Sequence, residues 1–154
     1  MPDELVMRNE ISRAINLLNK KKGGFSQEEL KDVLMAERID YEAGLKRMDG
    51  DTELYRQRAV TFASVCEERL RMLHEYNRNE DVMGYTALVH EVRSDAKSLG
   101  ASELMKTAWE QEIMGKDGDY DFLKNKFTLL ATEYQRVAQC YNILFCGLTE
   151  EGGK

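Results

Sequence analysis

The chain contains a single proline, Pro2, so no later residue has the ring that would break a helix. Beyond it, apolar residues recur at steps of three and four, which is the period of a helix with one buried face. Four stripes follow this period: Tyr55, Ala59, Phe62, Cys66, Leu70 and Leu73; Leu88, Val89, Val92, Ala96 and Leu99; Ala101, Leu104, Met105, Ala108 and Trp109; and Leu123, Phe127, Leu130, Tyr134, Val137, Tyr141 and Leu144. The pattern predicts an all-α fold.

Residues that commonly cap helices mark where the helices begin. The candidates are Ser26 with Glu29 as a capping box, Asp40, Asp51 or Thr52, and Ser102, while the sequence GKDGD over 115–119 predicts a turn before the last helix. Four long amphipathic helices with short connections predict an antiparallel four-helix bundle over residues 37–146.

Residues 1–36 lie before this bundle and are predicted to form a helical extension. Within residues 3–36, one face carries Met7, Ile11, Ala14, Ile15 and Leu18. Such a face would be exposed on an isolated helix, so we expect the extension to pack on the bundle. Residues 147–154 are expected to form a short tail.

Composition excludes several classes of function. The net charge of −6 argues against general nucleic-acid binding, which needs a basic face. No stretch approaches the roughly 18 apolar residues of a membrane span, and the N-terminus lacks a signal-peptide core, so a cytoplasmic location is expected. The three cysteines form no CxxC pair and are expected to be reduced thiols.

One histidine stands out by its place on a predicted helix. On a helical wheel with His90 at zero and about 100° per residue, the apolar residues fall between about 160° and 240°. These residues are Leu88, Val92, Ala96 and Leu99. His90 should therefore face water. Arg93, Ser94 and Lys97 fall on the exposed side with it. A neutral imidazole is a good nucleophile near neutral pH, and the two cations could stabilise a phosphoryl group on it.

A carboxylate in the next stripe fits the same site. Glu112 falls within the sector of Ala101, Met105 and Ala108, and a carboxylate facing inward needs a partner. If the two helices pack side by side, Glu112 can accept a hydrogen bond from Nδ1–H of His90 and leave Nε2 as the free nucleophile. The alternative is an ordinary surface histidine on a solvated helix face.

Metal-binding alternatives fit the sequence less well. A di-metal bundle needs inward Glu-x-x-His pairs, but position 87 is Ala87 and His90 is predicted to face outward. The segment 117–128 has calcium-loop spacing at its first positions, but Phe122 replaces the required glycine and Thr128 the last glutamate. No metal site and no nucleotide-binding loop are therefore predicted, and no cofactor is expected.

The stretch HEVRSDAKSLGA resembles the signature of histidine-containing phosphotransfer (HPt) domains, with His90, Arg93, Ser94 and Gly100 at the family's spacing. The stretches 39–62 and 101–127 resemble the blocks on either side, so the resemblance covers about residues 37–146. It implies an HPt-like four-helix bundle in which His90 is the phosphoacceptor and Glu112 lies beside the imidazole. Arg93 stands where the family usually has lysine. Arg93, Ser94, Lys97 and Gly100 would then serve the phosphoryl group and the docking receiver.

The implied protein is a phosphoryl carrier and not an enzyme. His90 would take the phosphoryl group from an aspartate of a response-regulator receiver domain and pass it to another, in a relay fed by a hybrid sensor histidine kinase. The receiver would supply Mg²⁺ and the catalytic acids. Glu91 and Asp95 depart from the family's often neutral surroundings of the histidine and bear on the choice of partner. The alternative is a helical module that binds a receiver or kinase without chemistry.

Overall fold

The computed structural model describes residues 25–146, and these residues form helices and no strand, which confirms the all-α class. The helices are α2 (Gln27–Ala36), α3 (Tyr41–Arg47), α4 (Thr52–Ser64), α5 (Cys66–Arg78), α6 (Val82–Leu99), α7 (Ser102–Lys116) and α8 (Tyr120–Cys146). The predicted last helix begins directly after the glycine turn and is unbroken.

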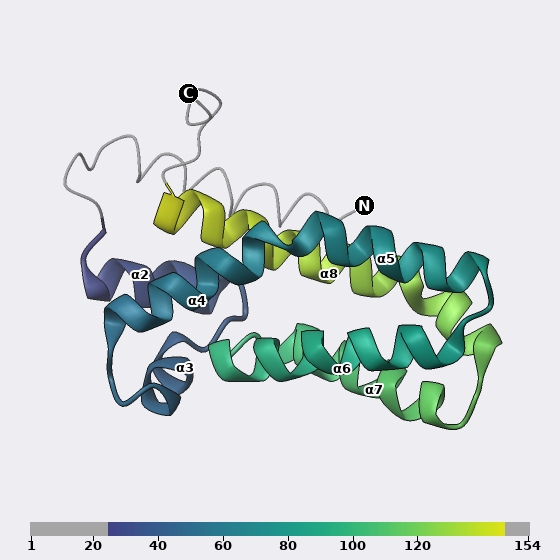
Figure 1. The fold of residues 1–154 in the computed structure, drawn as a ribbon. Coiled ribbons are helices and arrows are strands. Elements are labelled where there is room, and N and C mark those ends of the chain that lie inside the picture. Colours follow the sequence, from purple (N-terminus) through teal and green to yellow (C-terminus); the bar gives the residue numbers. More distant parts are fainter. Residues whose placement is uncertain (1–24, 147–154) are drawn as a thin grey trace.

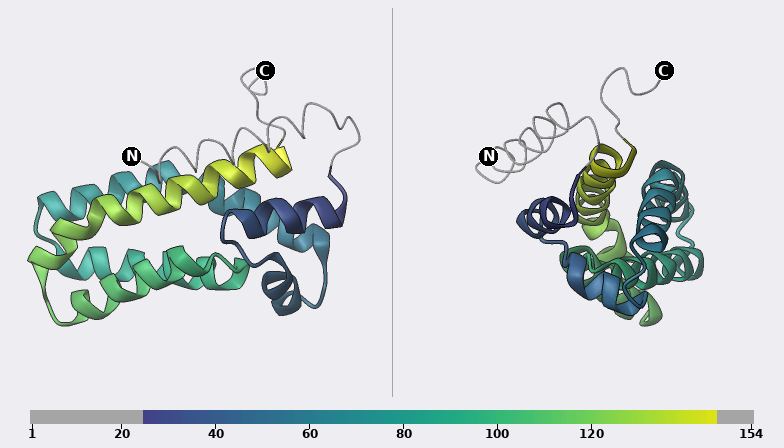
Figure 2. Two further views of the ribbon diagram at one scale, coloured as in Figure 1. Left: turned by 180° about the vertical axis from the view of Figure 1, so that it is seen from behind. Right: turned by 90° about the vertical axis from the view of Figure 1, so that its left-hand side faces the viewer.

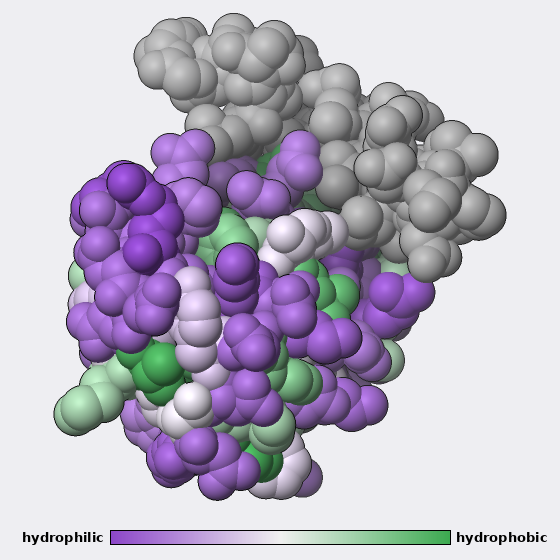
Figure 3. All heavy atoms as spheres, turned by 90° about the vertical axis from the view of Figure 1, so that its right-hand side faces the viewer, coloured by the Kyte–Doolittle hydropathy of each residue, from purple (hydrophilic) through white to green (hydrophobic). Residues whose placement is uncertain are grey.

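The long helices pack in two neighbouring pairs. Helices α4 and α5 follow one another along α8, whereas α6 and α7 form a hairpin whose members pack most closely on each other (Figures 1 and 2). Contacts of α7 with α8 and of α5 with α6 join the two pairs around one core. The end of the molecule that carries the α5–α6 and α7–α8 connections is mainly hydrophilic with separate apolar spots (Figure 3).

Most predicted caps are present. Ser26 and Glu29 form the reciprocal capping box of α2, and the side chains of Asp40 and Asp51 accept hydrogen bonds from the first turns of α3 and α4. The prediction for Ser102 was wrong, because Ala101 is the N-cap of α7 and Ser102 is its first helical residue. The Ser102 hydroxyl instead donates to the carbonyl of Gly100 at 3.3 Å.

The stripe from Tyr55 to Leu73 belongs to two helices instead of one. Helix α4 ends at Ser64, α5 begins at Cys66, and Val65 lies between them. The Tyr134 hydroxyl donates to the carbonyl of Phe62 at 2.9 Å, the acceptor that a continuous helix would offer to the Cys66 N–H. All six residues of the stripe are nevertheless buried, so the bend keeps one apolar face toward the core.

Buried tyrosines fix the contacts between distant helices. The Tyr55 hydroxyl donates to the carbonyl of Leu99 at 2.7 Å and lies 2.8 Å from the Tyr141 hydroxyl. Burial raises the pKa of Tyr55 well above its usual range. The hydroxyls of Tyr55 and Tyr141 are therefore both hydrogen-bonded inside the core, as burial of a polar group requires.

One residue of the predicted stripes does not belong to the core. Trp109 is 51% exposed, although Leu104 and Ala108 in the same stripe are buried. The buried face of α7 instead continues through Gln111 and Gly115, and at 100° per residue this face turns away from Trp109. An aromatic residue at helical spacing was therefore misread as core.

The part of the predicted extension that the structure describes packs on the rest of the chain. Leu30 and Leu34 of α2 are buried in the common core. Beside the end of α2, Arg136 of α8 donates to the backbone carbonyl and the carboxylate of Glu37. The predicted burial of Met7, Ile11, Ala14, Ile15 and Leu18 lies outside the described residues, as does the predicted tail over residues 147–154.

None of the helices formed by residues 25–146 combines the length and the apolar character needed to cross a membrane. Cys66 and Cys140 are buried and Cys146 is exposed. Burial raises the pKa of the Cys66 thiol to about 12, so this cysteine stays a protonated, apolar packing residue at neutral pH.

Candidate functional site

His90 lies in the middle of α6 and points away from the core. Its side chain is 52% exposed, whereas its neighbours Leu88, Val89 and Val92 are buried. Helical periodicity forces this orientation, because the residues two before and two after His90 point into the core. The predicted exposure of His90 is therefore confirmed.

Glu112 of α7 contacts the inner side of the imidazole. Its Oε2 atom lies 2.7 Å from Nδ1 of His90, and its Oε1 atom accepts from Nε of Arg93 at 2.5 Å. Lys116 Nζ lies 3.3 Å from the same Oε2 atom. The Glu112 carboxylate is thus in polar contact with the side chains of His90, Arg93 and Lys116. The predicted contact between His90 and Glu112 is confirmed.

The geometry favours one tautomer of His90. Nδ1 lies 2.7 Å from the Glu112 carboxylate but also 3.1 Å from Nη2 of Arg93. A carboxylate only accepts and a guanidinium only donates, so Nδ1 cannot satisfy both. The shorter, charge-assisted contact takes precedence, which places the proton on Nδ1. The Nε2 atom then keeps its lone pair on the exposed part of the ring.

A close approach of α6 and α7 brings these side chains together. Gly115 lies against Thr86, and a Cβ atom at position 115 would overlap the Thr86 hydroxyl oxygen. Gly115 therefore belongs to α7, inside the helix, and not to the turn that the sequence predicted from residue 115. Gly115 lies three residues after Glu112, so this tight contact is about one helical turn from the carboxylate.

The other predicted site residues fall into two groups. Ser94 and Lys97 are exposed on α6 beyond His90, and Arg93 is half-buried toward Glu112. Gly100 is not part of this surface. It ends α6 in a left-handed conformation, with φ of 86°, and is buried against the backbone of Asp40.

Sequence reasoning missed Lys116 as a member of the site. The spacing of Glu112 and Lys116 could have indicated it, since a glutamate and a lysine four residues apart meet on one face of a helix. The acidic residues next to His90 point elsewhere. Arg69 of α5 binds Asp95 at 2.9 Å and lies 3.7 Å from Glu91, so both carboxylates face the guanidinium on α5.

The Glu112 carboxylate is held ionised. Burial raises its pKa, but hydrogen bonds from Arg93, His90 and Lys116 outweigh burial, and the pKa of Glu112 lies below its usual range. A permanent anion beside Nδ1 keeps the imidazole oriented.

We expect this carboxylate to make stability depend on pH in the acid range. A depressed folded-state pKa contributes stability that is fully present above the unfolded pKa and is lost as the pH falls through the folded value. Wild type should therefore exceed Glu112→Gln in free energy of unfolding at pH 7, by about 1 to 2 kcal/mol. Urea unfolding at pH 7 and pH 3 measures the free energy of unfolding of both proteins. A difference between wild type and Glu112→Gln that is the same at the two pH values would contradict a lowered pKa of Glu112.

Comparison of the chain with protein-family models, with curated proteins and with solved structures finds no match. Within residues 25–146, no three His, Cys, Asp or Glu side chains are grouped to hold a metal ion. The candidate site therefore consists of an exposed imidazole whose inner nitrogen is bound to a buried, ionised carboxylate, with arginine and lysine side chains around them.

Proposed function

We propose that this protein is a histidine phosphotransfer protein with His90 as its phosphoacceptor. One observation carries the proposal: Glu112 holds Nδ1 of His90 at 2.7 Å while the ring is exposed, which leaves Nε2 open to a partner. The resemblance of the sequence around His90 to HPt domains supports the same function, and the helices around the site would form the antiparallel four-helix bundle of that family.

The chemistry needs no further group from this chain. The Nε2 lone pair attacks the phosphorus of an aspartyl phosphate on a receiver domain, the N–P bond forms, and the bond from phosphorus to the aspartate oxygen breaks. The aspartate leaves as a carboxylate and Nδ1 keeps its proton. The ring becomes an imidazolium, and the Glu112 anion offsets its charge. The reverse steps pass the group to a second receiver.

The arginine and the lysines of the site have different roles. Arg93 is bound to Glu112 and holds the carboxylate in place. Lys97 and Lys116 are exposed on α6 and α7, so their ammonium groups can follow the incoming phosphoryl oxygens. The receiver supplies Mg²⁺ and the acidic residues that bind it. The partners are thus a response-regulator receiver and a hybrid sensor histidine kinase.

Phosphoryl transfer from a labelled receiver tests the proposal. Full-length protein is mixed with a receiver domain phosphorylated on its aspartate, and the label is followed by gel and by mass spectrometry. We expect acid-labile, base-stable label on the peptide that contains His90. Label that stays on the receiver with several unrelated receivers, or label on another residue, would refute it.

Glu112 is expected to act as a positioning residue. Glu112→Ala should slow transfer to His90 by about 10- to 100-fold, because the ring loses the acceptor that fixes its tautomer. Glu112→Gln keeps a carbonyl oxygen at that place and should recover most of the rate. Single-turnover transfer kinetics separate the two variants. Equal rates in Glu112→Ala and Glu112→Gln would contradict this role.

A module that binds without chemistry is the second candidate. Its support is the exposed apolar surface on the two helices of the site, with Met83 on α6 and Trp109 and Ile113 on α7. Large apolar side chains in water often mark protein contacts. Tight binding of a receiver by both wild type and His90→Ala, with no transfer by either, would favour this candidate.

A further inference from the structure

A pocket lies on the side of α6 next to α4 and α5. Its volume is about 370 Å³, near the lower end of the range for ligand pockets. The residues that line it are Leu54, Gln57, Arg58, Thr61, Phe62, Val65, Arg69, Asp95, Ser98 and Leu99. Neither His90 nor Glu112 is among them, so the pocket is separate from the candidate phosphotransfer site.

The packing of the helices explains why this pocket is open. Helix α4 packs mainly on α8, and α6 packs mainly on α7, so the seam between α4 and α6 is the weakly closed one. Val65, the residue at the bend between α4 and α5, lines the pocket. The bend and the divided packing together leave a hollow that no described side chain fills.

The lining is apolar with a few polar groups. Leu54 and Val65 are half-buried and provide accessible apolar surface, whereas Phe62 and Leu99 are buried beside them. The lining also has hydrogen-bonding groups, from Gln57, Thr61 and Ser98. Mainly apolar walls with a few placed polar groups are typical of sites for small organic ligands.

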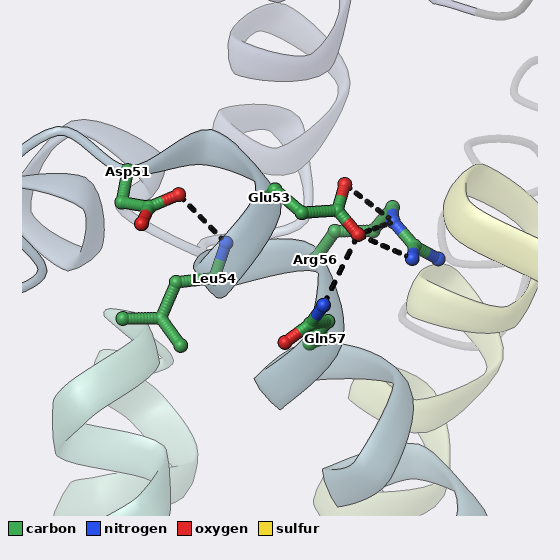
Figure 4. Close-up of polar contacts among 5 residues, drawn as sticks. All are labelled: Asp51, Glu53, Leu54, Arg56 and Gln57. Atoms are coloured by element: carbon green, nitrogen blue, oxygen red, sulfur yellow. Dashed lines mark hydrogen bonds and ion pairs between the residues drawn. The ribbon is translucent and has the colours of Figure 1, made fainter.

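Among the residues that the structure describes, one cation of the lining forms no ion pair. The Arg69 side chain is 16% exposed and binds Asp95 at 2.9 Å, so these two charges offset each other. Arg58 is exposed, and no ion pair joins it to another residue of the described chain. Arg56, two residues earlier, is held by Glu53 through bonds as short as 2.6 Å (Figure 4). The remaining charge of the lining is therefore the guanidinium of Arg58.

We propose that this pocket binds a small organic anion, with its apolar ring against the half-buried Leu54 and Val65 and a carboxylate or phosphate on Arg58. A guanidinium binds either group through paired hydrogen bonds. The hydroxyls of Thr61 and Ser98 are further donors in the same lining. The proposal does not depend on phosphotransfer by His90.

Two matched probes test the charge requirement on the full chain. The titrants are 2-naphthoate and its uncharged relative 2-naphthamide, followed by ¹H–¹⁵N NMR. We expect saturable shifts from naphthoate at amides of residues 54–65 and 95–99, and binding of the amide about ten-fold weaker, as expected for a lost charged hydrogen bond. Shifts elsewhere, equal binding of the two probes, or no saturable binding of naphthoate would overturn the proposal.

Three variants locate the site. Arg58→Gln should weaken naphthoate binding about ten-fold, and Ser98→Leu should weaken it by filling the hollow. Arg56→Gln is the matched control on the same helix, because Arg56 is paired with Glu53 and lies outside the lining. His90→Ala should bind like wild type. Unchanged binding in Arg58→Gln, or equal losses in Arg58→Gln and Arg56→Gln, would refute the assignment.

Discussion

His90→Ala should abolish phosphoryl acceptance completely while the protein stays folded. The proposed reaction needs the Nε2 lone pair, and alanine offers no nucleophile in its place. The ring is 52% exposed, so its removal should change the free energy of unfolding by no more than about 1 kcal/mol. Label transfer from a phosphorylated receiver measures the first effect, and urea unfolding measures the second.

His74→Ala is the matched control, because the chain has two histidines and both are exposed on helices. His74 lies on α5 with its ring centroid 5.8 Å from that of Phe127, and no ion pair joins it to another residue within 25–146. The His74→Ala variant should accept label at the wild-type rate. If His90→Ala takes up label and His74→Ala does not, the phosphoacceptor has been assigned to the wrong histidine.

Gly100→Ala should lower the free energy of unfolding by about 3 kcal/mol or more, well above the effect of Gly50→Ala. Gly100 has φ of 86°, a conformation that alanine adopts only at a cost of about 1 to 2 kcal/mol. A Cβ atom there would also overlap the carbonyl of Asp40, and Asp40 N donates to the Gly100 carbonyl at 2.8 Å. The new methyl group must therefore separate two backbone segments that are joined by a hydrogen bond.

Gly50→Ala isolates the part of this cost that comes from the backbone conformation. Gly50 has φ of 77°, and a Cβ atom there would meet nothing within 4 Å. It should cost only about 1 to 2 kcal/mol. Chemical unfolding of both variants gives the difference. A Gly100→Ala protein with wild-type stability but no transfer would instead show that Gly100 serves partner docking, the role implied by the family resemblance.

The sequence determined the class of the fold and the direction in which His90 points. Both follow from local rules: apolar residues at steps of three and four form one face of a helix, and a helix places residues two apart on nearly opposite faces. The caps at Ser26, Asp40 and Asp51 were readable for the same reason, since each side chain bonds to the backbone within three residues. Such interactions do not depend on how helices are arranged in space.

The errors came where a neighbouring element decides the outcome. The bend at Val65 depends on the hydroxyl of Tyr134, which is far along the chain and competes for a helix carbonyl. Trp109 has the right spacing for the core, but the rotation of α7 against its neighbours turns it into solvent. Periodicity gives the width of an apolar face only approximately, and packing sets its centre.

The candidate site shows the same division. The residue types and their places on two separate helices could be found in the sequence, and they led to the expected pairing of His90 with Glu112. Whether the two helices lie close enough was decided by the tertiary contact of Gly115 with Thr86, and the position of Lys116 followed from it. The pocket beside α4 could not be predicted, because it exists only where the packing of two helix pairs leaves their seam open. A pocket of this kind is formed by residues distant in sequence, so the apolar pattern of a single helix cannot predict it.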